Sequence, residues 1–163
     1  MKKIFYIANV RLPTEKAHGI QIMEMLSALI RNLPSDTLVQ LIIPRRVNKI
    51  KRNPFEYYGL RSDFQIKKLP CVDLIFLPLF KTWWFWIENI TFTIFAATYF
   101  LFERGAIYYT RDALIAAVFS LLGKTVFYEI HDLPDRASWL HKLAWKKSRG
   151  TKASKSADVE KGG

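Results

Sequence analysis

The chain almost lacks cysteine: Cys71 is the only one among 163 residues. A disulfide within the chain is therefore excluded, and so is a metal cluster held by several thiolates. Cys71 lies between Pro70 and Val72 in an apolar stretch. Because a free cysteine in such surroundings behaves as a small hydrophobic side chain, we expect a packed thiol rather than a reactive one.

Several signatures of phosphate and nucleophile chemistry are also missing. The sequence contains no Gly-x-Gly-x-x-Gly motif, no Walker lysine motif and no Gly-x-Ser-x-Gly elbow. His18, His131 and His141 are not spaced from carboxylates or from the cysteine as metal ligands are. The sequence therefore predicts no resident metal and no resident cofactor.

No hydrophobic run is long enough for an ordinary membrane-spanning helix, which needs about 20 apolar residues. Residues 74–102 are strongly apolar, but Pro78, Lys81 and Glu88 interrupt them. The expected structure is a core helix. A helix that dips into the membrane surface is an alternative, because residues 83–86 read Trp-Trp-Phe-Trp and tryptophan favours the lipid–water interface. A true span is a third reading.

The N-terminus does not have the pattern of a secretory signal. Its apolar run at residues 4–10 is short and is interrupted by Asn9, and no small-residue cleavage site follows. We therefore expect a cytoplasmic protein, with peripheral contact at the inner face of the cell membrane as an extension of that expectation.

Acidic residues are few: 14 of them face 25 lysines and arginines, and the net charge is +11. This balance favours anionic partners such as phosphates, nucleic acid or an acidic membrane surface. One cationic cluster at residues 45–52 contains no acid, and a second lies at residues 142–161. Neither has the interleaved aromatic residues of a platform for single-stranded nucleic acid. Nucleic acid is therefore the least supported partner.

The order of the apolar segments predicts an α/β fold, a Rossmann-like open parallel sheet with helices on both faces. Runs rich in β-branched and aromatic residues predict strands at 4–10, 38–44, 64–69, 106–110 and 125–130. Helical spacing and capping residues predict helices at 19–33, 83–102, 113–122 and 135–147, with a short turn at 54–59. Residues 1–148 are expected to form one domain, followed by a disordered polar tail at 149–163.

Candidate binding residues gather where the predicted strands end, because ligands of such sheets bind outside the carboxyl ends of the strands. Gly19 lies near a helix N-terminus, where backbone N–H groups and the helix dipole favour a phosphate. Lys16 and His18 precede it and add positive charge or hydrogen-bond donors. The alternative is an ordinary loop in which glycine only eases the turn.

Two more strand ends carry polar residues. Arg111 follows one strand and could bind a phosphate or carboxylate, or it could pair with Asp112 or Glu129 and only order the loop. Glu129 and His131 end the last strand, and His131 could donate to a sugar hydroxyl or transfer a proton. The alternative for His131 is a satisfied structural histidine.

The chain resembles the N-terminal domain of family 4 glycosyltransferases over about residues 1–147. The resemblance lies in three segments: residues 17–21 (Ala-His-Gly-Ile-Gln), 108–112 (Tyr-Tyr-Thr-Arg-Asp) and 128–132 (Tyr-Glu-Ile-His-Asp). Each is short, and their order and spacing carry the likeness. It implies the N-terminal half of a GT-B fold, in which two Rossmann-like domains face each other across a cleft.

That resemblance also implies a function. The family moves a hexosyl group from a nucleotide-diphosphate sugar to a glycan or lipid-linked acceptor, with retention of configuration and usually without metal. By analogy the backbone near Gly19 faces the donor diphosphate, and His131 is the catalytic contact to the donor sugar. Lys16, His18, Arg111 and Glu129 then line the donor and acceptor sites.

The family's second domain, with its paired glutamates, has no counterpart in these 163 residues. We therefore expect a truncated, frame-shifted or separately encoded half that is inactive without a C-terminal partner domain or chain. The rival hypothesis is a non-enzymatic, basic, aromatic-rich α/β protein that binds a membrane surface or a protein partner.

Overall fold

The computed structural model describes residues 2–61, 64–73 and 81–129, except for the side chains of residues 81–85. The predicted helix at 135–147 and the polar tail lie outside the described residues. Along the chain the elements are β1 (Lys2–Ile7), α1 (Ala17–Arg31), β2 (Thr37–Pro44), α2 (Pro54–Tyr57), β3 (Gln65–Leu69), α3 (Lys81–Tyr99), β4 (Ala106–Thr110), α4 (Ala113–Leu121) and β5 (Thr125–Tyr128).

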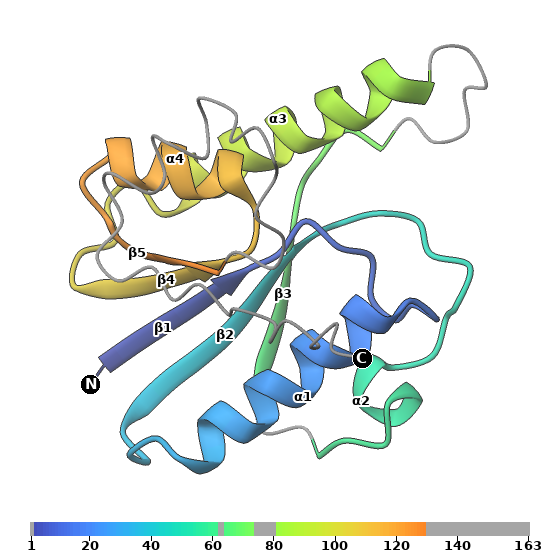
Figure 1. The fold of residues 1–163 in the computed structure, drawn as a ribbon, viewed down its shortest axis with the longest axis vertical. Coiled ribbons are helices and arrows are strands. Elements are labelled where there is room, and N and C mark those ends of the chain that lie inside the picture. Colours follow the sequence, from blue (N-terminus) through green and yellow to red (C-terminus); the bar gives the residue numbers. More distant parts are fainter. Residues whose placement is uncertain (1, 62–63, 74–80, 130–163) are drawn as a thin grey trace, which may run out of the picture.

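The five strands form one sheet in the order β3-β2-β1-β4-β5. Every neighbouring pair is parallel, and β1 lies in the centre between β2 and β4. Figure 1 shows α1 and α2 against one face of the sheet and α3 and α4 against the other. The predicted Rossmann-like open sheet with helices on both faces is therefore confirmed.

Two element boundaries differ from the predicted ones. β1 ends at Ile7 rather than at Val10, and the side chain of Asn9 beyond it forms hydrogen bonds with Asn89 of α3 and Arg46 after β2. α1 begins at Ala17, so Gly19 lies inside the first turn rather than opening the helix. The segment between β1 and α1 is correspondingly a long loop at the carboxyl end of the central strand.

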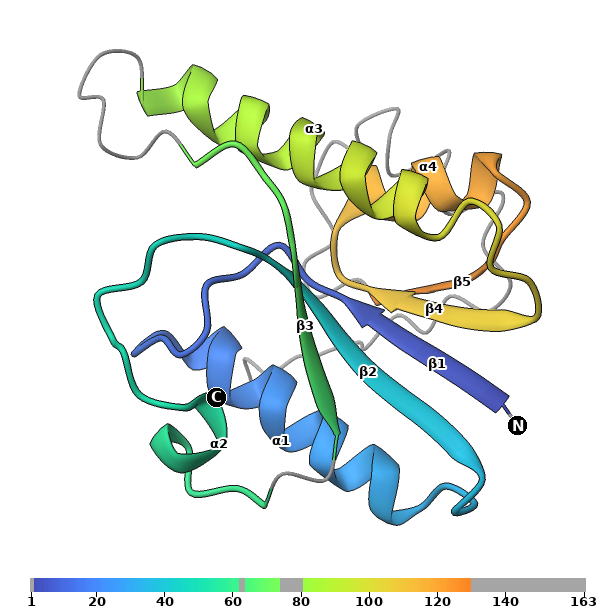
Figure 2. The same ribbon diagram turned by 180° about the vertical axis from the view of Figure 1, so that it is seen from behind.

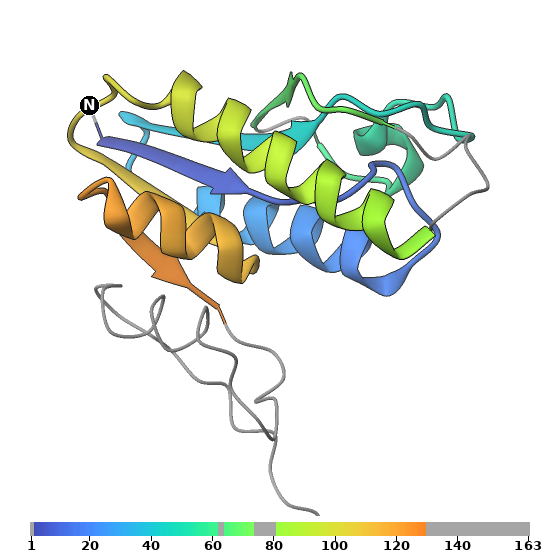
Figure 3. The same cartoon turned by 90° about the horizontal axis from the view of Figure 1, so that it is seen from above.

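Each face of the sheet has its own hydrophobic core. Figure 3 looks onto the face that α3 and α4 cover, with α1 behind the strands. The core under α1 and α2 contains alternate residues of the central strands, such as Tyr6 and Leu41. The core under α3 and α4 contains the alternating residues of the same strands that face the other side of the sheet, such as Phe5 and Ile42. This alternation is what a parallel sheet covered on both faces requires.

The α3–α4 core is built around a cluster of aromatic rings in tilted and edge-to-face contact. The Phe100 ring lies 4.6 Å from Phe5 and 5.2 Å from Tyr108, measured between ring centroids, and Phe119 completes the group. Such rings bury large apolar areas and add edge-to-face attraction. They fix the end of α3 to β1 and β4.

The α4 helix begins as the sequence predicts. The Asp112 carboxylate accepts hydrogen bonds from the N–H groups of Leu114 at 2.9 Å and Ile115 at 3.2 Å. Gly123, just beyond the helix, has φ of 72°, a conformation that glycine adopts without strain.

In the part of the chain that the structure describes, no helix combines the length and apolar character needed to cross a membrane.

We expect Phe100→Ala to lower the free energy of unfolding by about 3–5 kcal/mol, because it opens a cavity among the aromatic rings. Phe100 is 1% exposed, whereas Phe102 is 88% exposed, so Phe102→Ala is the matched control and should change stability by less than about 0.5 kcal/mol. Urea denaturation followed by circular dichroism measures both. Equal losses in the two variants would contradict this packing.

Candidate functional site

The candidate site lies at the carboxyl edge of the sheet, where β1 and β4 are neighbours. The chain leaves β1 toward β2 on one side, and β4 continues toward β5 on the other, so the strand order reverses between them. In open α/β sheets the loops separate at such a point and leave a crevice in which ligands bind. The loop after β1 and Arg111 after β4 border it.

Arg111 and Glu129 form a two-pronged ion pair at this edge. The guanidinium donates through Nε to Oε2 of Glu129 at 2.9 Å and through Nη2 to Oε1 at 3.1 Å. The N–H of Glu129 also donates to the Thr110 carbonyl at 3.0 Å, which extends the pairing of β4 with β5. The pairing with Glu129, one of the alternatives that the sequence left open, is therefore the one observed.

Two tyrosines lie beneath this pair. The rings of Tyr6 and Tyr109 stack with centroids 5.3 Å apart, and Tyr6 is fully buried. Burial raises the pKa of Tyr6, although the nearby charge of Arg111 opposes the shift. Burial also raises the pKa of Tyr109, and the carboxylate of Glu129 raises it further. Both phenols therefore stay protonated at neutral pH and present hydrogen-bond donors close to Arg111 and Glu129.

The N-terminus of α1 adds positive potential to the same edge. No side chain in the described part of the molecule caps it, and its first turn contains no acid. Lys16 precedes the helix and His18 lies in its first turn. Partial burial lowers the pKa of His18 below its ordinary value of 6.5, and the charges of Lys16 and Arg111 lower it further. These three residues are thus close enough to influence one another.

Gly19 has a steric role that the sequence did not reveal. A Cβ atom at this position would collide with the Thr14 methyl group and with the Tyr58 hydroxyl. That hydroxyl donates to the Thr14 carbonyl and accepts from the Thr14 N–H, both at 2.8 Å. Glycine therefore lets α1 approach the β1–α1 loop closely and lets Tyr58 hold that loop in place.

A second charged cluster, which we call the Glu88 network, was missed in the sequence. Glu88 comes from α3 and is 5% exposed. Its carboxylate lies 3.3 Å from Arg46 after β2 and 3.7 Å from Arg11 after β1. Arg11 also donates to Asp73 after β3 at 2.8 Å. The network therefore ties the loops that follow three neighbouring strands to α3.

Amide side chains extend this network. Arg46 donates to Oδ1 of Asn9 at 2.6 Å, and Asn9 donates to Oδ1 of Asn89 at 3.1 Å. Arg46 belongs to the cationic cluster at residues 45–52, which contains no acid, yet its side chain is largely buried beside Glu88 of α3. The available signal was Glu88 and Asn89 interrupting an otherwise apolar helix. Burying them requires a cation beside the carboxylate and a hydrogen-bond partner for the amide.

Cys71 packs against the α3–α4 core, as the sequence predicts. Its thiol donates to the Arg45 carbonyl at 3.4 Å, and burial raises its pKa above the ordinary range. A thiol with a raised pKa is a poor nucleophile at neutral pH. Cys71 therefore plays a packing role beside the Glu88 network.

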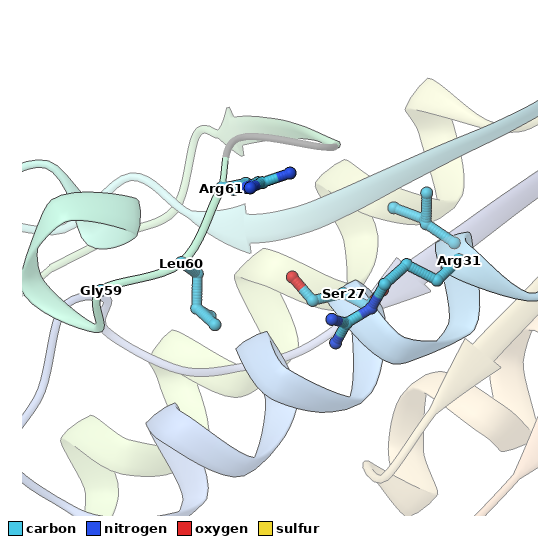
Figure 4. A pocket seen from close by; sticks show the side chains of 6 residues that line it. Ser27, Arg31, Gly59, Leu60 and Arg61 are labelled. Carbon is cyan, nitrogen blue, oxygen red and sulfur yellow. The ribbon is translucent and has the colours of Figure 1, made fainter.

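Two surface cavities differ in their position relative to the edge. One, of about 300 Å³, lies between the β1–α1 loop and the loop after β2, and its walls include Thr14, Lys16 and Lys49. A larger one, of about 730 Å³, lies beside the last turns of α1, with Arg31 on one wall and Arg61 on the other (Figure 4). Because α1 runs back across the sheet, the larger cavity is far from the strand ends, and we assign the site to the edge.

The structure thus brings together Lys16, His18, Arg111 and Glu129. Gly19 lies beside them but faces Tyr58 and Thr14. His131, the predicted catalytic residue, lies outside the described residues. Among the residues that are described, no group of three or more histidine, cysteine or carboxylate side chains is arranged to hold a metal ion.

No protein-family model matches this sequence, and no curated protein does. Its fold is similar to that of UGT2 from Phytolacca americana, which was solved in a ligand complex and in the apo form. For the complex with UDP-2-fluoro-glucose and pterostilbene the TM-score is 0.51, with 17% identity over 79% of this chain. For the apo form it is 0.52, with 15% identity over 80%. The chain spans about 30% of the length of these proteins, and at such identities the likeness concerns the fold alone.

We expect Gly19→Ala to destabilise the protein, since the new methyl group must displace Tyr58 or Thr14. Overpacking of this kind typically costs about 1–3 kcal/mol. Combining it with Tyr58→Phe, which removes the colliding hydroxyl, should cost less than the sum of the two single changes. Strict additivity in urea denaturation would show that the two groups do not meet.

The Glu88 network yields a second prediction. Glu88→Ala leaves Arg46 buried without its carboxylate and should lower the free energy of unfolding by about 3 kcal/mol or more. Glu103→Ala is the matched control, because Glu103 pairs with Lys3 at 2.8 Å in a more exposed position and should cost less than about 1 kcal/mol. Thermal unfolding of both variants measures the two losses. A loss for Glu88→Ala no larger than that for Glu103→Ala would show that Glu88 behaves as an ordinary surface ion-pair partner.

Proposed function

We propose that this chain forms one wall of a glycosyltransferase active site that moves a sugar from a nucleotide-diphosphate donor to a glycan or lipid-linked acceptor. The observation that carries the proposal is the convergence of Lys16, His18 and the Arg111–Glu129 pair at the point where the strand order reverses. The fold likeness to UGT2, which was solved in complex with UDP-2-fluoro-glucose, is consistent with a nucleotide-sugar ligand.

The donor diphosphate would bind at the N-terminus of α1. A helix of 15 residues that lacks an acidic first turn and a side-chain cap places the positive end of its dipole at the crevice. Lys16 and His18 would add charge and hydrogen-bond donors there. Charge stabilisation of a leaving diphosphate by preorganised donors is the main catalytic contribution that such a wall can make.

Arg111 and Glu129 would hold the reacting groups in position. The two-pronged pair fixes both side chains, so neither has to be ordered when substrate arrives. The guanidinium would attract phosphate oxygens, and the carboxylate would accept from a sugar hydroxyl. His131, which follows this strand end in the sequence, would be the catalytic contact to the donor sugar.

The cavity beside the β1–α1 loop would take part of the acceptor. Its volume of about 300 Å³ suits a small polar group, and Lys16 and Lys49 outnumber the carboxylate of Glu15 on its walls, which favours an anionic group. An acceptor carrying a phosphate, such as a lipid-linked glycan, has that chemistry. This assignment places donor and acceptor on either side of Lys16.

The remaining wall would come from a second Rossmann-like domain or a partner chain. The resemblance to family 4 supports this view, and so does the share of UGT2 that the likeness covers. By the same resemblance the transfer would retain configuration, and it would use the nucleotide sugar as substrate without a resident cofactor or metal. Catalysis by positioning and charge needs both walls.

Nuclear magnetic resonance of His18 tests the proposed donor site. We expect its pKa to lie below 6.5 in the free protein and to rise when UDP is added, because a bound anion stabilises the protonated imidazole. Uridine, which has no phosphate, should leave the pKa unchanged. Lys16→Ala should weaken UDP binding by about tenfold or more, since a hydrogen bond to a charged group contributes about 1.5–3 kcal/mol.

Lys68→Ala is the matched control, because Lys68 is an exposed lysine on β3 rather than at the crevice. It should leave UDP binding unchanged. The proposal fails if UDP leaves the His18 pKa unchanged and if the Lys16→Ala and Lys68→Ala variants bind UDP with the same affinity. The donor site would then not lie at this edge.

A further inference from the structure

One side of α3 is exposed and apolar between residues 86 and 95. We call the residues Trp86, Ile90, Ile94 and Phe95 the α3 strip, and each is exposed. Trp86, Ile90 and Ile94 recur at spacings of four, which places them in one row on the helix. In Figures 1 and 2 this helix lies at the outside of the fold, with α4 beside its last turns.

The strip contains no charge at all. From residue 86 to residue 99 the only ionisable group that carries charge at neutral pH is Glu88, and it is buried in its own network. The other exposed positions of this stretch are Thr98 and Tyr99. A surface helix normally has a polar outer face, and a helix that is apolar all round is normally covered. The strip therefore requires an apolar surface against it.

Cationic side chains lie at the C-terminal end of α3, beyond the strip. Lys67 lies 4.3 Å from the centre of the Tyr99 ring. Lys124 donates to the carbonyl groups of Leu101 at 2.9 Å and of Glu103 at 2.7 Å, and Arg104 is exposed beside them.

Only one carboxylate lies among the described residues of this end, that of Glu103, and Lys3 neutralises it at 2.8 Å. The apolar strip therefore continues into a cationic border. Exposed apolar side chains beside lysine and arginine are the composition of a helix that lies in the surface of an anionic bilayer.

We propose that the α3 strip docks on the surface of an anionic lipid bilayer. Trp86 and the two isoleucines would enter the boundary between headgroups and acyl chains, and Arg104 and Lys124 would contact the anionic headgroups. Trp86 suits this depth because its ring is apolar and its N–H is polar. A second copy of the chain matches less well, since two molecules that each carry +11 repel one another. This inference is independent of the proposed transferase function.

Co-sedimentation with vesicles tests the proposal. The full chain should bind vesicles made of equal amounts of phosphatidylcholine and phosphatidylglycerol, and should bind pure phosphatidylcholine much less. The double variant Ile90→Gln/Ile94→Gln should weaken binding by about tenfold or more, because it removes two apolar side chains from the contact. Arg104→Gln should weaken it by about fivefold, the effect of one cation near a charged surface.

Leu121→Gln is the matched control, because Leu121 on α4 and Ile94 on α3 are both 58% exposed. It should bind as the unmodified chain does, and circular dichroism confirms that each variant is folded. Absence of binding to anionic vesicles, or equal binding by the double variant, overturns the proposal. So does a dimer in analytical ultracentrifugation that the double variant dissociates, because a second copy would then cover the strip.

Discussion

The parallel direction of all five strands is the constraint on which the rest of this structure depends. It brings the carboxyl ends of the strands to one edge, and it forces each return crossover to run along a face of the sheet. Two hydrophobic cores follow, one under α1 and α2 and one under α3 and α4. Polar loops that are far apart in the sequence consequently gather at the edge where the strand order reverses.

Two charged clusters divide that edge between them. The Glu88 network joins the loops after β1, β2 and β3 to α3, and its charges are mutually compensated and largely buried. The group around Arg111, Glu129 and the start of α1 is more open and carries an excess of positive potential. We interpret the first as the support that fixes the loops and the second as the surface that meets an anionic ligand.

Sequence patterns predicted the fold well, because a buried parallel strand is a continuous apolar run and Asp112 marks a helix start unambiguously. They also placed Arg111 and Glu129 at one edge. They did not reveal the collision between Gly19 and Tyr58, which depends on residues 39 positions apart meeting in space. Nor did they pair Arg46 with Glu88, since periodicity reports which face a residue occupies but not which charge lies opposite it. The role of His131 stays a prediction.

Mapping the amide chemical shifts of the whole chain as UDP is added tests whether a nucleotide sugar binds at the carboxyl edge of the sheet. We expect shifts confined to the loop after β1, the start of α1 and the ends of β4 and β5, with saturation at a single affinity. Shifts centred on the cavity between Arg31 and Arg61, or no saturable shifts, would contradict a nucleotide-sugar site at the carboxyl edge.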